Sequence, residues 1–288
     1  MVVRHRNPWI DYLKAFAIYL VIVGHMITNC MSRGSELKVT GIIYFIHIPL
    51  FLIISGYLVK DKRIDSKFWI GLIKRFLVPY TVWTMILTTF YQGFSHLMYD
   101  GLFANMQIYF NNWCHSFLWF IKAYLVTYIL WQSLQRFSCW WRLGVGTVGL
   151  VIVNILALES KSLSELSSLS LYSYTLFGIG ACVGKNVDRI KVYWLVFLAL
   201  SFFLCLPFAT PSNNYFECSF SHMVQFGSWH VFFIRFIAGF CFSFVLIALG
   251  RIRRKIPPPI QLHNLTRNRQ TYIANIHVAV VACRGSIE

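Results

Sequence analysis

The stretch that decides the fold is WIDYLKAFAIYLVIVGHMITN, residues 9–29. It is long enough to cross a bilayer as a helix, and its ionisable residues are Asp11, Lys14 and His25. Because a helix turns about 100° and rises about 1.5 Å per residue, Lys14 and His25 share one face, roughly 16 Å apart. Ionisable groups at membrane depth usually face a bundle interior or a watery cavity. This face therefore predicts a functional site.

Composition supports a membrane protein. Of the 288 residues, 57% are hydrophobic and 12% are charged, whereas soluble domains average about 25% charged residues. The net charge of +16 does not indicate nucleic-acid binding, because the basic residues lie in short segments between apolar runs. The cysteines and histidines show no zinc-ligand spacing, so no metal site is predicted. The fold class predicted is an all-α polytopic bundle of transmembrane helices.

The pattern of apolar runs predicts about eight spans. They fall near residues 9–30, 41–59, 70–92, 117–134, 143–158, 171–187, 191–210 and 229–250. Segments before the first span and after every second span hold fifteen basic residues: Arg4, Arg6, Lys60, Lys62, Arg63, Lys67, Arg136, Arg142, Lys185, Arg189, Lys191, Arg251, Arg253, Arg254 and Lys255. The opposite loops hold three, which are Arg33, Lys38 and Lys161. This asymmetry predicts a multi-pass membrane protein with a cytoplasmic N-terminus.

Two longer segments, 93–116 and 211–228, are predicted as outer loops. They lack Lys and Arg and are rich in aromatic and amide side chains, which suit either a sugar-binding surface or an interfacial belt. Residues 1–250 form the predicted transmembrane domain. The tail, 251–288, is basic and polar, and its one apolar stretch is too short to cross a membrane.

Further polar residues within the predicted spans indicate a ligand. His47 lies two residues before Pro49, which opens a helix locally, and Ser55 follows; His47 suits a structural role as well as a functional one. Lys122 and Arg235 also lie inside spans, so cations outnumber acids in the bundle and an anionic ligand is expected. The adjacent Lys74 and Arg75, at the cytoplasmic end of the third span, fit either lipid phosphates or the phosphates of a nucleotide-bearing ligand.

Four segments resemble, in order and spacing, the acyltransferase-3 family of integral membrane O-acyltransferases. They are WIDYLKAFAIYLVIVGH (9–25), FIHIPLFLIISGYL (45–58), KRFLVPY (74–80) and LWFIKAYL (118–125). The nearest branch by resemblance is the fucose-4-O-acetylase-like proteins. The resemblance is strong over about residues 8 to 130 and general over about 170 to 250.

The resemblance implies a membrane O-acetyltransferase that moves an acetyl group from cytoplasmic acetyl-CoA to a hydroxyl of a cell-surface or lipid-linked sugar. It also implies a multi-pass location in the bacterial inner membrane, and no permanently bound cofactor is expected. The family's basic residue and histidine, ten residues apart, fall on Lys14 and His25, and its basic pair falls on Lys74 and Arg75. We expect His25 to act as general base, Asp11 to hold Lys14, and Lys74 and Arg75 to bind the phosphates of CoA. The pocket candidates are His47, Ser55, Trp119, Lys122 and Arg235.

The sequence departs from the family in two ways. Many members have Arg where Lys14 stands, and Lys lacks the planar fork of Arg. Members usually have about ten spans, and NRQTYIANIHVAVV (268–281) is similar to a degraded form of a late family segment, as in a shortened or frame-altered C-terminus. Two alternatives stay open: an inactive shortened acyltransferase, and a transporter or flippase with Asp11, Lys14 and His25 as a proton relay.

Overall fold

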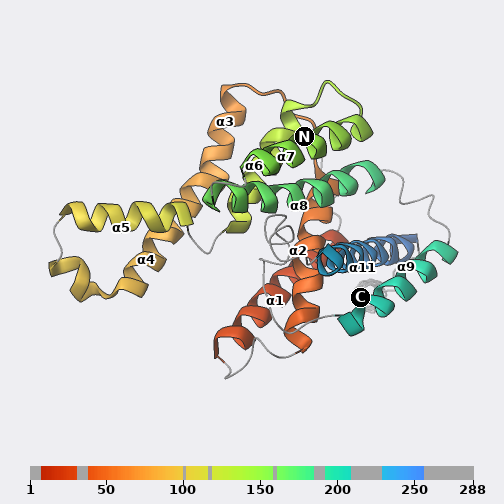
Figure 1. Ribbon diagram of the computed structural model, residues 1–288. Helices are drawn as coiled ribbons and strands as arrows, with labels where there is room; N and C mark the ends of the chain where they lie inside the picture. Colours follow the sequence, from red (N-terminus) through yellow and green to blue (C-terminus); the bar gives the residue numbers. More distant parts are fainter. Residues whose placement is uncertain are drawn as a thin grey trace, which may run out of the picture. The chain divides into compact units, whose positions relative to one another are not determined.

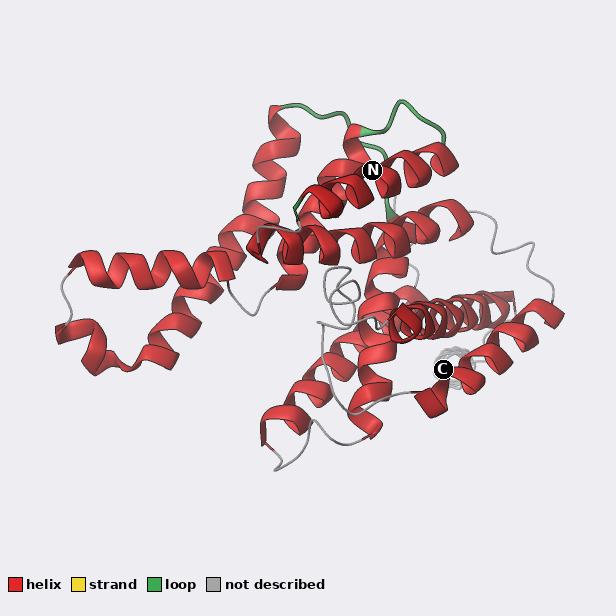
Figure 2. Cartoon of the chain, in the orientation of Figure 1, coloured by secondary structure: helices red, strands yellow, loops and turns green. Residues whose placement is uncertain are grey.

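The computed structural model describes residues 8–30, 38–99, 102–115, 119–157, 161–184, 192–208 and 229–255. Every regular element in these ranges is a helix (Figure 2). The main helices are α1 (Pro8–Cys30), α2 (Lys38–Leu58), α3 (Ser66–Leu72), α4 (Val78–Tyr99), α5 (Leu102–His115), α6 (Trp119–Ser133), α7 (Cys139–Leu156), α8 (Lys161–Gly184), α9 (Val192–Cys205) and α11 (Trp229–Lys255). The prediction of an all-α helix bundle is confirmed.

Six segments of the described chain are long and apolar enough to cross a membrane. They are Pro8–Thr28, Val39–Leu58, Ser66–Phe90, Cys139–Leu156, Leu166–Val183 and Phe233–Gly250. Each coincides with a predicted span. The two remaining predicted spans are also helical, but α6 has 15 residues and α9 has 14, so neither reaches the usual spanning length by itself.

Helix α2 is the central helix, and glycines let its neighbours approach its backbone closely. It packs most extensively against α8, where a Cβ on Gly56 would lie 1.8 Å from the Phe177 carbonyl oxygen and a Cβ on Gly180 would lie 2.3 Å from the Ile53 carbonyl oxygen. Helix α11 meets α2 in the same way, because a Cβ on Gly239 would lie 2.3 Å from Cγ of Pro49. Small residues at helix contacts are typical of membrane bundles, which gain stability from close packing.

A buried polar cluster joins α7 to α8. The Asn154 side-chain oxygen accepts hydrogen bonds from the Ser168 hydroxyl at 2.6 Å and the Ser167 hydroxyl at 3.2 Å, while its amide nitrogen donates to the Leu150 carbonyl at 2.7 Å. Hydroxyl and amide groups within a bundle are stabilised by such bonds, because lipid offers them no partner. The cluster fixes the register of the two helices.

Helices α4 and α5 form an antiparallel hairpin, labelled at the left of Figure 1. The Tyr80 hydroxyl donates to the Trp113 carbonyl, the Trp113 indole donates to the Thr81 hydroxyl at 3.1 Å, and the hydroxyls of Thr89 and Tyr109 are 2.7 Å apart. The predicted outer segment 93–116 is helical, because α4 continues to Tyr99 and α5 returns alongside α4 to the level of Tyr80. Its position outside the membrane stays a prediction. Hydrogen bonds from Thr and Trp side chains outweighed the low apolar content of α5.

The chain divides into two units, residues 1–249 and residues 250–288. The elements above belong to the first unit, apart from the last residues of α11. Of the predicted tail, α11 covers residues up to Lys255, so the described helix runs past the predicted end of the last span. The predicted outer loop 211–228 and residues 256–288 lie outside the described residues.

Candidate active site

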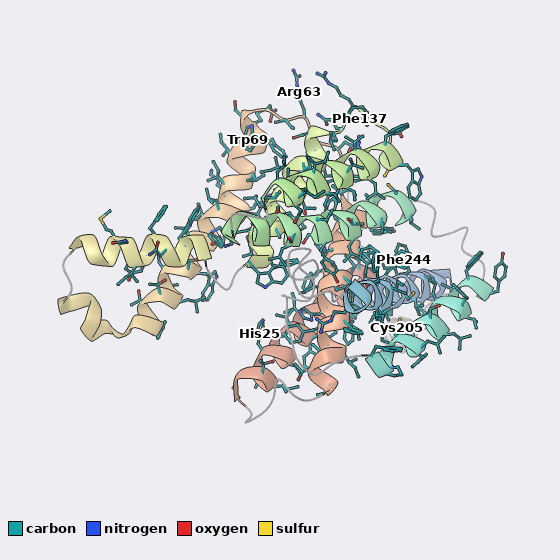
Figure 3. All side chains as sticks on the ribbon, viewed as in Figure 1. His25, Arg63, Trp69, Phe137, Cys205 and Phe244 are labelled. Atoms are coloured by element: carbon teal, nitrogen blue, oxygen red, sulfur yellow. The ribbon has the colours of Figure 1, made fainter. Side chains whose placement is uncertain are left out.

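The first candidate region is the edge of the contact between α1 and α2. The buried residues of α1 include Leu13, Ala17 and Gly24, which repeat at helical spacing and face α2 and α11. Lys14 and His25 each follow one of these buried residues directly, so they lie on one common flank of the contact, as the eleven-residue spacing predicts. Lys14 and Asp11 are half-buried, whereas His25 is exposed (labelled on α1 in Figure 3).

His25 and His47 lie on either side of Tyr44. The His25 and Tyr44 rings are 6.4 Å apart between centroids, and the Tyr44 and His47 rings are 5.1 Å apart. His47 is buried, and its Nδ1 lies 2.8 Å from the Ile43 carbonyl oxygen. A carbonyl can only accept, so Nδ1 donates, and in the neutral ring Nε2 is left with its lone pair. Two imidazoles with one fixed tautomer make this region suited to proton transfer.

Arg235, another predicted pocket residue, approaches a different side of α2. It lies on α11, it is buried, and its guanidinium is 5.2 Å from the centroid of the Phe45 ring. Phe45 and His47 are two residues apart in a helix, which places them on nearly opposite sides. The structure therefore places Arg235 beside Phe45, in the N-terminal half of α2.

The second region is a basic pocket of about 370 Å³ formed by the segment between α2 and α3, by α3 and its extension, and by α6. It contains four cations and one acid among its lining residues, which are Lys62, Arg63, Asp65, Lys67, Phe68, Gly71, Leu72, Arg75, Phe76, Tyr124 and Tyr128. Its volume lies in the range of small-molecule sites, and cations beside aromatic rings suit a ligand with phosphates and a planar base.

Both members of the predicted phosphate-binding pair are exposed, and of the two Arg75 lines this pocket whereas Lys74 does not. Lys67, Gly71 and Arg75 recur at four-residue spacing, which puts them on one face of the helix. Both members of the pair lie in a π-helical turn, Ile73–Leu77, where the Val78 N–H bonds to the Ile73 carbonyl. Pro79 has no N–H to bond to the Arg75 carbonyl, which accounts for the wider turn at this point.

The segment that supplies Lys62 and Arg63 is held in place by two side chains that sequence reasoning missed. The Gln132 side chain accepts from the Lys62 N–H and donates to the Lys60 carbonyl, both at 3.0 Å. Arg142 binds both carboxylate oxygens of Asp61, at 2.6 and 3.2 Å. Arg142 was predicted only as a topology-setting charge. It is instead buried in the bundle, with its side chain 9% exposed.

A line of aromatic side chains extends from the basic pocket along α6. Phe120, Tyr124 and Tyr128 follow one another at four-residue spacing, and neighbouring rings in this series are 6.1 and 6.3 Å apart. On α2, Tyr44, His47, Phe51 and Ser55 also share one face by their spacing. We call these four residues the α2 stripe. Figure 3 labels Arg63, which lines the pocket, and His25, whose ring lies near Tyr44 of the α2 stripe.

The α2 stripe and the α6 aromatic series contact each other at two levels. The Ser55 hydroxyl is within hydrogen-bonding reach of the Tyr124 hydroxyl, and the Phe51 and Phe120 rings are 6.1 Å apart. The pocket candidate Trp119 stands at the start of α6, with its ring 6.1 Å from that of Phe120. Lys122 is half-buried on α6. These contacts link Trp119, through Phe120, and Ser55 to the pocket residue Tyr124, and the α2 stripe continues from Ser55 to His47.

Comparison with known proteins adds the family. An acyltransferase domain model matches residues 7–264, which is most of the chain. The chain belongs to the acyltransferase-3 family. This confirms the resemblance identified from the four sequence segments, and the matched region includes every candidate site residue of α1, α2, α6 and α11.

Two curated relatives are named nodulation protein NolL. The protein from Mesorhizobium japonicum is 24% identical over 216 residues, which is 70% of this chain and 56% of the relative. The protein from Sinorhizobium fredii is 25% identical over 212 residues, 70% of this chain and 55% of the relative. The chain thus spans about half the length of the curated relatives it matches. No solved structure matches.

Proposed function

We propose that this protein is a membrane O-acetyltransferase that transfers an acetyl group from acetyl-CoA to a hydroxyl of a cell-surface or lipid-linked sugar. The observation that carries the proposal is the basic pocket, whose four cations and aromatic walls connect through the Ser55–Tyr124 contact to the α2 stripe and the two histidines. Family membership supports acyl transfer. CoA combines phosphates, an adenine ring and a long thin arm that ends in the thioester, and the site offers a matching series of surfaces.

In this proposal Arg75, with Lys62, Arg63 and Lys67, binds the phosphates of CoA, and Lys74 contributes only to the local positive charge. The arm extends toward the two histidines, and Lys14, held by Asp11, orients it from α1. Ser55 to His47 is eight residues, or about 12 Å along α2. A long arm therefore brings the thioester from the pocket to the level of a base.

His25 is the proposed general base, because an alcohol is a weak nucleophile at neutral pH. His25 takes the hydroxyl proton as the sugar oxygen attacks the thioester carbonyl. The tetrahedral intermediate then collapses, the C–S bond breaks, and the imidazolium returns the proton to the departing thiolate. The products are the acetylated sugar and free CoA. His25 is exposed in the described structure, which leaves its ring accessible to an acceptor.

The test is transfer of radiolabelled acetyl groups from acetyl-CoA to membrane glycans and glycolipids by the full chain in native membranes. We expect His25→Ala to abolish transfer while CoA binding is retained. Transfer at the wild-type rate in this variant would exclude His25 as the base. Solute uptake without any transfer of label by the wild-type protein would refute the proposal and favour a transporter.

A further inference from the structure

The contact between Ser55 and Tyr124 lies at the side of the basic pocket that α6 forms. Tyr124 lines the pocket and also belongs to the α6 aromatic series. Its ring lies 5.5 Å from that of Phe76 and 6.0 Å from that of Phe177, which belong to other helices. Ser55 lies on the α2 stripe and is half-buried. These two hydroxyls thus form a polar pair between the pocket and the apolar rings of Phe51 and Phe120.

Beyond this pair, the surface is formed by rings. Phe51 of α2 faces Phe120 of α6, and both are half-buried, as is Tyr124. A ligand that leaves the pocket along this surface therefore meets hydroxyl groups first and apolar rings afterwards. His47 lies about two turns of α2 from Ser55.

We propose that the Ser55 and Tyr124 hydroxyls bind the amide groups of an extended thioester-bearing arm, and so guide it from the basic pocket toward the histidines. This proposal rests on the proposed function. An amide offers one N–H donor and one carbonyl acceptor, and each hydroxyl can both donate and accept, so the pair can exchange its mutual contact for two bonds to the arm. The apolar rings of Phe51 and Phe120 then flank the less polar part of the arm. Ser55 and Tyr124 are positioning residues in this scheme, because neither touches the reacting carbonyl.

The position of the pair predicts that loss of either hydroxyl weakens binding of a ligand with the arm but not of a ligand without it. A ligand with the nucleotide but no arm occupies the basic pocket alone, so removal of either hydroxyl leaves its affinity unchanged. A ligand with the arm loses one hydrogen bond, which corresponds to about a fivefold loss of affinity. A purely structural role for the pair would alter the pocket and weaken both ligands together.

The experiment measures binding of two probes to the full chain in lipid nanodiscs by calorimetry. The probes are coenzyme A and 3′-phospho-ADP, which is the part of coenzyme A without the arm. Tyr124→Phe and Ser55→Ala test the contact from its two sides, so one of them remains informative if the other variant does not fold. Tyr19→Phe and Ser201→Ala are matched controls, because Tyr19 is 61% exposed on α1 and Ser201 bonds only to the Phe197 carbonyl of its own helix.

We expect both test variants to bind coenzyme A about fivefold more weakly than wild type and to bind 3′-phospho-ADP equally well, while the controls bind both probes normally. Equal affinity of wild type and both variants for coenzyme A would overturn the arm proposal and leave the proposed function intact. An equal loss for both probes would also overturn it, because the effect would then lie in the pocket. Failure of the wild-type protein to bind either probe would refute the proposed function itself.

Discussion

Arg142 is the residue whose removal should most disturb the end of the bundle near the basic pocket. Its guanidinium binds Asp61 through both nitrogens of the fork, and its Nε donates to the Phe137 carbonyl at 2.8 Å. A second guanidinium bond goes to the Gln135 carbonyl, and the guanidinium lies 5.7 Å from the Trp131 ring. One side chain thereby joins the segment after α2 to the turn between α6 and α7.

The cost of Arg142→Ala follows from these contacts. Each lost bond to a backbone carbonyl costs about 1 kcal/mol. The ion pair adds less than about 1 kcal/mol, because the Asp61 side chain is 55% exposed and water screens it. The contact with the Trp131 ring adds about 0.5–1 kcal/mol, so the whole loss is about 3 kcal/mol. Asp61→Asn removes the charge of the ion pair but keeps one acceptor oxygen, so it should cost no more than about 1 kcal/mol.

The measurement is reversible unfolding in mixed micelles by SDS titration, followed by tryptophan fluorescence. Arg142→Ala should unfold at clearly lower SDS, and Asp61→Asn should stay close to wild type. Arg136→Ala is the matched control, because Arg136 is exposed in the same turn. If Asp61→Asn destabilises the protein as much as Arg142→Ala, the backbone carbonyls are not the main partners and the reasoning is wrong.

Three further predictions follow from the geometry. Arg75→Ala should raise the KM for acetyl-CoA several-fold while Lys74→Ala leaves it nearly unchanged, since Arg75 alone of the pair lines the pocket; equal effects in steady-state kinetics would contradict this assignment. Gly56→Ala should destabilise the bundle by at least about 1–3 kcal/mol, because its Cβ would meet the backbone of α8. Gly149→Ala should stabilise α7 slightly, because a Cβ there meets no atom within 4 Å. SDS titration compares the two variants, and unchanged stability of Gly56→Ala would refute the close approach of α2 and α8. Gln107 is exposed and lies in the segment predicted outside the membrane, so a single cysteine there, with the native cysteines replaced, should react with a membrane-impermeant maleimide in intact cells. Reaction only after permeabilisation would contradict the predicted orientation.

The fold was largely predictable because the membrane imposes one strong pattern on the sequence. Each predicted apolar run coincides with a helix, and the spacing of Lys14 and His25 placed both on one flank of α1. The exception was α5, which has too many amide residues for a hydropathy pattern. Its helix depends on bonds to Thr81 and Thr89 of α4, and such pairings between separate segments leave no mark in a local pattern.

The candidate site was only partly predictable for the same reason. Charge near the predicted cytoplasmic ends of spans indicated Arg75, and the four-residue spacing from Lys67 was the signal that could have separated Arg75 from Lys74. The roles of Gln132 and Arg142 had no such signal. Their partners, Lys60, Lys62 and Asp61, lie at least 70 positions earlier in the chain, so only the tertiary structure brings them together.

The glycine contacts of α2 bear on which helices would move if the proposed transfer requires the bundle to open. Main-chain atoms of α8 and the ring of Pro49 leave no room for α2 to slide or rotate against α8 and α11. Helices α1 and α4 bury far less of their surface than α2 and α8 do. Widening of the bundle to admit or release a bulky acceptor is therefore expected at α1 and α4, with α2 as the stationary element, and crosslinks from α2 to α8 should leave turnover intact.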